Sequence, residues 1–165
     1  MIRAFAAALE DENLLVRRGA LDLLLQCMRV DSPAVQRAHP DDRTILMRAA
    51  IGVVLRRDLS LNRRLYTWLL GPEEKSASQI VHLRQHALDL LCTTLKQDMT
   101  TPLGEYAESR PFKIFISLLD KWEVGGPVSE VLVYDAFEAI KRLVSNADES
   151  NDVRSSYDML PLFNC

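Results

Sequence analysis

Residues 12–29, ENLLVRRGALDLLLQCMR, contain the pattern that decides the fold of this chain. Their apolar side chains recur at steps of three and four residues, which is the spacing of one face of an α-helix. The face consists of Leu14, Leu15, Leu21, Leu24, Leu25 and Met28, with Arg18 on the same side. The sequence therefore predicts an amphipathic helix over residues 12–29 with its apolar stripe turned toward a core.

The rest of the chain repeats this helical signature between short turns. We expect further helices at the N-terminus and over residues 41–57, 60–70, 78–98, 111–119 and 128–144, about seven in all. The intervening turns at 31–33, 58–60, 71–72 and 124–127 contain the Pro, Gly, Asp and Ser residues that end or cap helices. No segment shows the alternating pattern of a strand. We predict an all-α fold of stacked antiparallel helix pairs, a HEAT-like or armadillo-like helical repeat domain.

The length of 165 residues predicts a single helical domain over residues 1–165, which buries roughly 70% of the surface of its unfolded chain. Residues 146–152 are almost entirely polar. We therefore expect a polar linker followed by a truncated next element over residues 146–165. Because both ends lie in sequence of structured character, we interpret the chain as a fragment of a longer protein.

Charge and cysteine content exclude several classes of function. Lys and Arg total 20 against 23 Asp and Glu, so the net charge of −3 gives no general attraction to nucleic acid. The three cysteines are too few and too scattered for a disulfide framework, which favours the cytoplasm. The longest apolar run is far shorter than the ~20 residues that cross a bilayer, and the N-terminus lacks the features of a signal peptide.

The sequence predicts neither an enzyme nor a cofactor. His82, His86 and Asp89 have the spacing to share a helix face and to offer metal ligands. However, that face lies opposite the apolar stripe, and no Cys or Glu completes a metal motif, so we interpret these residues as a solvated surface. Nucleophile elbows, phosphate-binding glycine loops and dinucleotide fingerprints are absent from the sequence. We expect no catalytic residues and no metal site.

Four arginines are the main candidates for a binding site. Arg56 and Arg57 end one predicted helix, and Arg63 and Arg64 begin the next, so a short turn brings all four toward one edge. Four guanidinium groups at one edge suit a phosphate group or an acidic partner. The alternative is that these arginines pair internally with Asp58 or with neighbouring carboxylates and only support the fold.

Trp122 is a candidate contact for a protein partner. It follows Asp120 and Lys121 in a predicted turn, where a large aromatic side chain is either an exposed anchor or part of the core. Both alternatives remain open from the sequence.

Three segments together resemble the N-terminal region of the Dopey family. They are residues 53–71, VVLRRDLSLNRRLYTWLLG, residues 110–125, RPFKIFISLLDKWEVG, and residues 15–22, LVRRGALD. They occur in the order of the family, and the resemblance covers nearly the whole chain. The chain departs from the family pattern at Trp122, where a proline is expected, and in the short connection after Gly71.

The resemblance implies a non-catalytic scaffold or adaptor in membrane trafficking. Dopey proteins are peripheral membrane proteins of the Golgi, the trans-Golgi network and endosomes, and they act on the cytosolic face in transport between endosomes and Golgi. The implied partners are a Sec7-related Golgi scaffold and a phospholipid flippase. In animal members the N-terminal region is also linked to kinesin light chain and to membranes that contain phosphatidylinositol 4-phosphate.

The resemblance also suggests a role for the arginines. We carry over the hypothesis that Arg56, Arg57, Arg63 and Arg64 bind lipid phosphate or an acidic partner. The alternative is a purely structural helical-repeat segment whose arginines are paired internally and which binds no ligand itself.

Overall fold

The computed structural model describes residues 1–101 and 109–159, with side chains described as far as residue 151. All regular structure in this part of the chain is helical, which confirms the predicted fold class. The elements are α1 (Ile2–Leu9), α2 (Leu14–Cys27), α3 (Pro33–Gln36), α4 (Pro40–Ile51), the 3-10 helix η1 (Gly52–Arg56), α5 (Leu59–Leu70), α6 (Ser76–His86), α7 (Leu88–Thr100), α8 (Arg110–Leu118) and α9 (Trp122–Met159).

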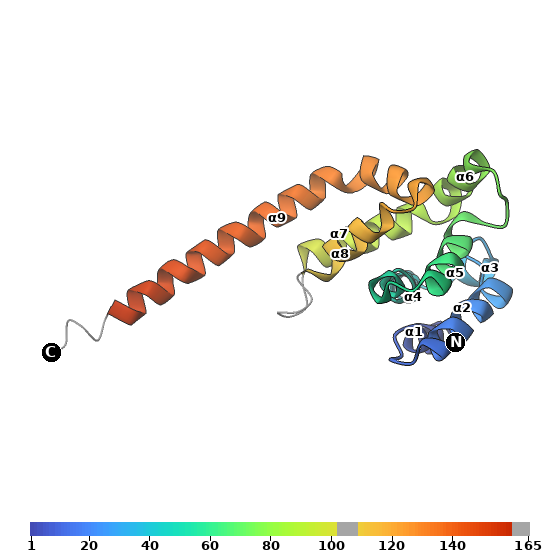
Figure 1. Ribbon diagram of the computed structural model, residues 1–165, viewed down its shortest axis with the longest axis horizontal. Coiled ribbons are helices and arrows are strands. Elements are labelled where there is room, and N and C mark those ends of the chain that lie inside the picture. Colours follow the sequence, from blue (N-terminus) through green and yellow to red (C-terminus); the bar gives the residue numbers. More distant parts are fainter. Residues whose placement is uncertain (102–108, 160–165) are drawn as a thin grey trace.

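The helices stack in two rows, as a helical repeat requires. Along one row α1 contacts α4 and α4 contacts α7, and along the other α2 contacts α5 and α5 contacts α6. The first part of α9 packs on α6 and α7 at the end of both rows, and the rest of α9 projects far beyond the other helices (Figure 1). α8 fits between η1, α7 and α9.

One continuous core lies between the two rows, and it runs from Leu9 in α1 to Ala139 in α9. Leu21 and Leu24 from the quoted helix are fully buried in it, as the sequence predicts. In contrast, Leu14 and Leu15 at the start of α2 are exposed and lie outside this core.

Two predicted helices are interrupted where the chain passes between the rows. The helix expected over residues 41–57 is α-helical only to Ile51 and continues as η1, which ends at Arg57 in the left-handed conformation. The helix expected over residues 78–98 is broken at Ala87 into α6 and α7. The break lets α6 pack on α5 while α7 packs on α4 in the other row. Burial of both halves therefore overrides the helical propensity of the segment.

The sequence prediction is wrong about the two ends of α9. Residues 124–127 were expected to form a turn, yet α9 begins at Trp122 and contains Pro127. A proline this close to the helix start removes only one backbone hydrogen bond. Residues 146–159, expected as a linker and a new element, continue α9 because neither Pro nor Gly follows Pro127 within the helix. Residues 160–165 lie outside the described part.

Ion pairs connect successive helices within each row and at the end of the rows. Arg48 Nη2 of α4 lies 2.7 Å from Asp98 Oδ1 of α7, and Arg84 Nη2 of α6 lies 2.9 Å from Glu130 Oε2 of α9. The Asp98 carboxylate accepts three hydrogen bonds from Arg48, and these hydrogen bonds raise the pKa of the Arg48 guanidinium.

Replacing Asp98 by alanine should lower the free energy of unfolding by about 1–2 kcal/mol, because it leaves a partly buried guanidinium without its charged partner. Both side chains are less than a third exposed, at 27% for Arg48 and 18% for Asp98, so solvent screens the pair only in part. Urea unfolding followed by circular dichroism measures the change. Asp148→Ala on the exposed part of α9 is the matched control, and an equal loss in both variants would contradict the role of the pair.

Candidate functional site

The turn between η1 and α5 holds the four predicted arginines. Arg57 has a φ of 52° and reverses the chain, and Asp58 then caps α5 by accepting a hydrogen bond from the backbone N–H of Leu61 at 2.9 Å. The cap therefore begins α5 at Leu59. Arg56 and Arg57 are both exposed at this turn.

Arg64 points back toward α2 and is held by internal partners. Its Nε lies 2.7 Å from Asp22 Oδ1, and its Nη1 donates to Ser60 Oγ at 2.6 Å. The same Ser60 hydroxyl accepts a hydrogen bond from Arg18 Nη2 at 2.8 Å. Arg64 is thus part of a network between α2 and α5, separate from the other three arginines.

Arg56 belongs to a second group of arginines that the sequence analysis missed. Its Nη2 donates to the backbone carbonyl of Glu12 in the loop between α1 and α2, and Arg17 Nη2 donates to the carbonyl of Glu10 at 3.2 Å. Burial, and then the charge of Arg56, lower the pKa of Arg17, and Arg110 contributes in the same direction, whereas the carboxylates of Glu10 and Asp11 act in the opposite direction.

These three residues, Arg17, Arg56 and Arg110, form a basic cluster between the start of α2, η1 and the start of α8. The guanidinium of Arg110 lies directly against Gly52 of η1. It is so close that a Cβ at position 52 would collide with it. No side-chain ion pair is found for the three among the described residues. Their separation along the chain hides the cluster from sequence reasoning, because no short-range spacing relates Arg17 to Arg110.

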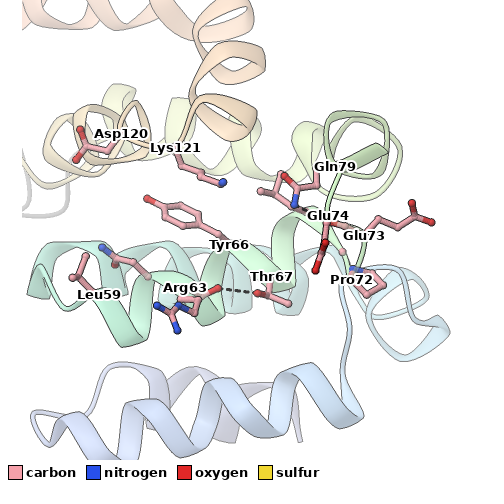
Figure 2. Close-up of a pocket in the computed structure, with 13 residues that line it drawn as sticks. Leu59, Arg63, Tyr66, Thr67, Pro72, Glu73, Glu74, Gln79, Asp120 and Lys121 are labelled. Carbon is pink, nitrogen blue, oxygen red and sulfur yellow. Dashed lines mark hydrogen bonds between the residues drawn. The ribbon is translucent and has the colours of Figure 1, made fainter. Parts of the chain in front are cut away.

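Arg63 lines a groove along α5 to which Arg56, Arg57 and Arg64 do not contribute. The groove has a volume of about 570 Å³ and lies between α5, the loop after it and the turn between α8 and α9. In Figure 2, Tyr66 points from α5 toward Lys121, the guanidinium of Arg63 lies on the side of α5 away from Lys121, and Glu73 lies toward the other end of the groove. Arg63 is therefore divided from Arg56 and Arg64, and the structure does not bring the four predicted arginines into one site.

Tyr66 is the central aromatic residue of this groove. Its side chain is half-buried, and burial together with the nearby charge of Asp120 raises the pKa of its hydroxyl. Lys121 is neutralised by Glu123, whose Oε2 lies 3.1 Å from Lys121 Nζ. The groove thus combines an aromatic wall with charges of both signs.

Trp122 stands next to the groove and is 71% exposed. It is the first residue of α9, although the sequence predicts a turn here. Its ring packs over Gly126: a Cβ built on Gly126 would lie 3.5 Å from Cζ2 of the indole. The structure therefore places this side chain outside the core, in a position to contact a partner.

Of the residues considered for a metal site, His82 and His86 are neighbours on α6, with ring centroids 4.9 Å apart, and the break at Ala87 divides Asp89 from them. His86 ends α6, whereas Asp89 lies in α7. His82 points inward and not into solvent as expected: its Nδ1 lies 3.2 Å from the carbonyl oxygen of Leu69 and its ring fills the space beside Gly71. Among the described residues, no group of three or more His, Cys, Asp or Glu has the geometry to hold a metal ion. No helix in the same part of the chain is long and apolar enough to cross a membrane.

Comparison with known proteins identifies the family. The family model described as "Dopey, N-terminal" matches residues 1–74, and the model described as "DOP1 middle TPR domain" matches residues 82–160. No solved structure matches the chain.

Relatives match over most of the chain. Protein dop1 of Emericella nidulans is 36% identical over 86% of this chain, protein DOP1 of Saccharomyces cerevisiae 29% over 96%, and protein DOP1B of Mus musculus 33% over 84%. The chain spans only 7–10% of the length of these three relatives. Since two Dopey models match in succession and relatives from fungi to animals align with both, the chain belongs to the Dopey family.

Proposed function

We propose that this chain is a non-catalytic module of a trafficking scaffold that works between endosomes and Golgi on the cytosolic face of their membranes. Membership of the Dopey family supports this function, and a helical repeat offers extended surfaces for partners rather than an enclosed active site. The proposed partners are a Sec7-related Golgi scaffold, a phospholipid flippase and kinesin light chain. The proposed location is the cytoplasmic surface of the Golgi, the trans-Golgi network and endosomes.

We further propose that the basic cluster recognises the phosphate groups of anionic lipids such as phosphatidylinositol 4-phosphate. The observation that supports this proposal is the approach of Arg17, Arg56 and Arg110 beside the exposed Arg57: none of the three forms a side-chain ion pair among the described residues, although the carboxylates of Glu10 and Asp11 lie near Arg17. Like charges held together are relieved by an anion, and guanidinium groups match phosphate oxygens in geometry. Arg63 and Trp122 then serve the neighbouring groove, where a protein partner is the proposed ligand.

Co-sedimentation with liposomes tests the lipid proposal. The double variant Arg56→Glu, Arg57→Glu should bind vesicles containing phosphatidylinositol 4-phosphate at least about thirtyfold more weakly than the unchanged chain, since each of the two lost basic residues contributes roughly 1 kcal/mol near an anionic surface. Arg37→Glu is the matched control, because Arg37 is equally exposed but lies at the end of α3. Equal binding by the double variant and the control would refute the assignment to this edge.

A purely structural role is the second candidate, and the network around Arg64 favours it for that residue. Arg64 is already satisfied by Asp22 and Ser60, so reversing its charge should disturb the contact between α2 and α5. If the unchanged chain fails to sediment with any anionic vesicle, the structural role holds for the whole arginine set.

A further inference from the structure

The groove that Arg63 and Tyr66 line, here called the α5 groove, is long and open. It runs from Leu59 at the start of α5 to Leu70 at its end, about 16 Å at 1.5 Å per residue. A second hollow of about 400 Å³ follows along α6 and shares Leu70, Pro72 and Glu73 with the first. An extended peptide advances about 3.3 Å per residue, so the part along α5 alone has room for roughly five residues of such a peptide.

Asn62 places an unpartnered hydrogen-bond acceptor in the wall of the α5 groove. It lies one helical turn before Tyr66, on the same face of α5, and both residues line the groove. Its side-chain oxygen Oδ1 is buried, yet it accepts no hydrogen bond from any described residue. A buried amide oxygen without a donor is unfavourable, so this position favours a bound molecule that supplies one. The backbone N–H of a peptide is such a donor.

The charges that the α5 groove offers to a ligand are mainly negative. Lys121 is neutralised by Glu123, and the guanidinium of Arg63 lies on the side of α5 away from Lys121 (Figure 2). Three exposed carboxylates line the groove and form no ion pair among the described residues, namely those of Glu73, Glu74 and Asp120. Complementary charge therefore favours a basic partner at this surface.

The carboxylates stand on both sides of the aromatic ring. Figure 2 shows Asp120 toward one end of the groove, Glu73 and Glu74 toward the other, and Tyr66 between them. The charge of Asp120 is close enough to Tyr66 to raise the pKa of its hydroxyl. An extended peptide with basic side chains on both sides of an apolar one matches this order of groups.

We propose that the α5 groove binds an extended basic segment of a partner protein. A backbone N–H of the segment donates a hydrogen bond to Asn62 Oδ1, and an apolar side chain packs on Tyr66. Lysine or arginine side chains lie against the carboxylates at the two ends of the groove. This binding mode rests on the proposed function, which assigns the groove to a protein partner, and it specifies the chemistry of that partner.

Selection from a phage library of random peptides tests the charge and spacing of the partner, with the whole chain as bait and peptides of about 12 residues, long enough to span both hollows. The enriched peptides should carry lysine or arginine on both sides of an apolar residue. Enrichment of acidic peptides would overturn the basic partner and leave the groove as a protein-binding site. If no peptide is enriched, both the binding mode and the assignment of the groove to a protein partner fail.

Two variants test whether the enriched peptides bind in the α5 groove. Asn62→Leu removes the acceptor at similar volume, and Glu73→Gln with Glu74→Gln removes two charges at constant shape. Fluorescence anisotropy with an enriched peptide should show about tenfold weaker binding for each, because a donor or a charge of the peptide then loses its partner. Asp148→Asn with Glu149→Gln is the matched control, because it removes two exposed charges from α9, far from the groove.

Two results of the anisotropy measurement would overturn the proposal. One is unchanged peptide binding by either groove variant, and the other is an equal loss in the control. Circular dichroism checks the fold of Asn62→Leu, which should be kept because Oδ1 has no donor in the free protein. All these variants should still bind vesicles as the unchanged chain does, so a failure of the peptide proposal is seen separately from a failure of the lipid proposal.

Discussion

Replacing Trp68 by alanine is expected to lower the free energy of unfolding by about 3–5 kcal/mol, the range found when a buried aromatic residue is truncated. Trp68 is 2% exposed and lies in the core between α5 and α2. Its indole N–H also donates a hydrogen bond of 2.9 Å to the carbonyl of Met28, at the end of α2. The alanine variant therefore loses packing and leaves a buried carbonyl without its donor.

Thermal and urea unfolding of Trp68→Ala measure this loss, and Trp122→Ala is the natural control. The two residues have the same side chain, but Trp122 is exposed, so its replacement should change stability by less than about 0.5 kcal/mol. A comparable loss of stability in both variants would contradict the expectation that only the buried Trp68 contributes substantially to stability.

Replacing Gly125 by alanine is expected to destabilise the protein by about 2–3 kcal/mol, near the upper end of what overpacking costs. A Cβ at this position would lie 2.7 Å from Leu119 Cα and 2.9 Å from the carbonyl oxygen of Leu118. Both atoms belong to the backbone at the end of α8, which cannot move aside as a flexible side chain does. Gly125 thus permits the close crossing of α8 and α9.

Gly19→Ala provides a control with the opposite sign. Gly19 lies inside α2, and a Cβ there would meet nothing within 4 Å. Alanine is favoured over glycine in a helix interior, so this variant should be more stable by about 0.5–1 kcal/mol. Chemical unfolding of both variants under the same conditions compares the signs, and a stabilised Gly125→Ala variant would contradict the close crossing.

The fold class follows from local information, and the sequence therefore predicts it well. Helical spacing of leucines, capping residues and short turns are properties of neighbouring residues, and they locate most helices correctly. The break at Ala87 does not follow from them. It depends on α6 and α7 packing on different helices, which is a property of the whole chain.

The candidate site was predicted less well for the same reason. Sequence reasoning selected arginines that are neighbours along the chain, yet Arg63 and Arg64 leave α5 in different directions and serve different surroundings. The cluster with Arg17 and Arg110 depends on three elements meeting in space. The sequence named Trp122 as a candidate because it is a large aromatic residue in a predicted turn after Asp120 and Lys121, with exposed and buried positions both open. The predicted turn proved to be a helix start.

The two family models match residues 1–74 and 82–160, but the packing of the molecule shows no boundary between these two segments. One hydrophobic core contains residues of both segments. The ion pair of Arg48 with Asp98 joins the first segment to the second. Ser76, which lies between the segments, donates a hydrogen bond of 2.7 Å from its Oγ to Glu123 Oε1 of the second segment. The segments are thus separate as units of sequence comparison but not as units of stability. A destabilising substitution in one segment therefore also lowers the stability of the other. Dividing the chain between residues 74 and 82 would expose core side chains of both parts.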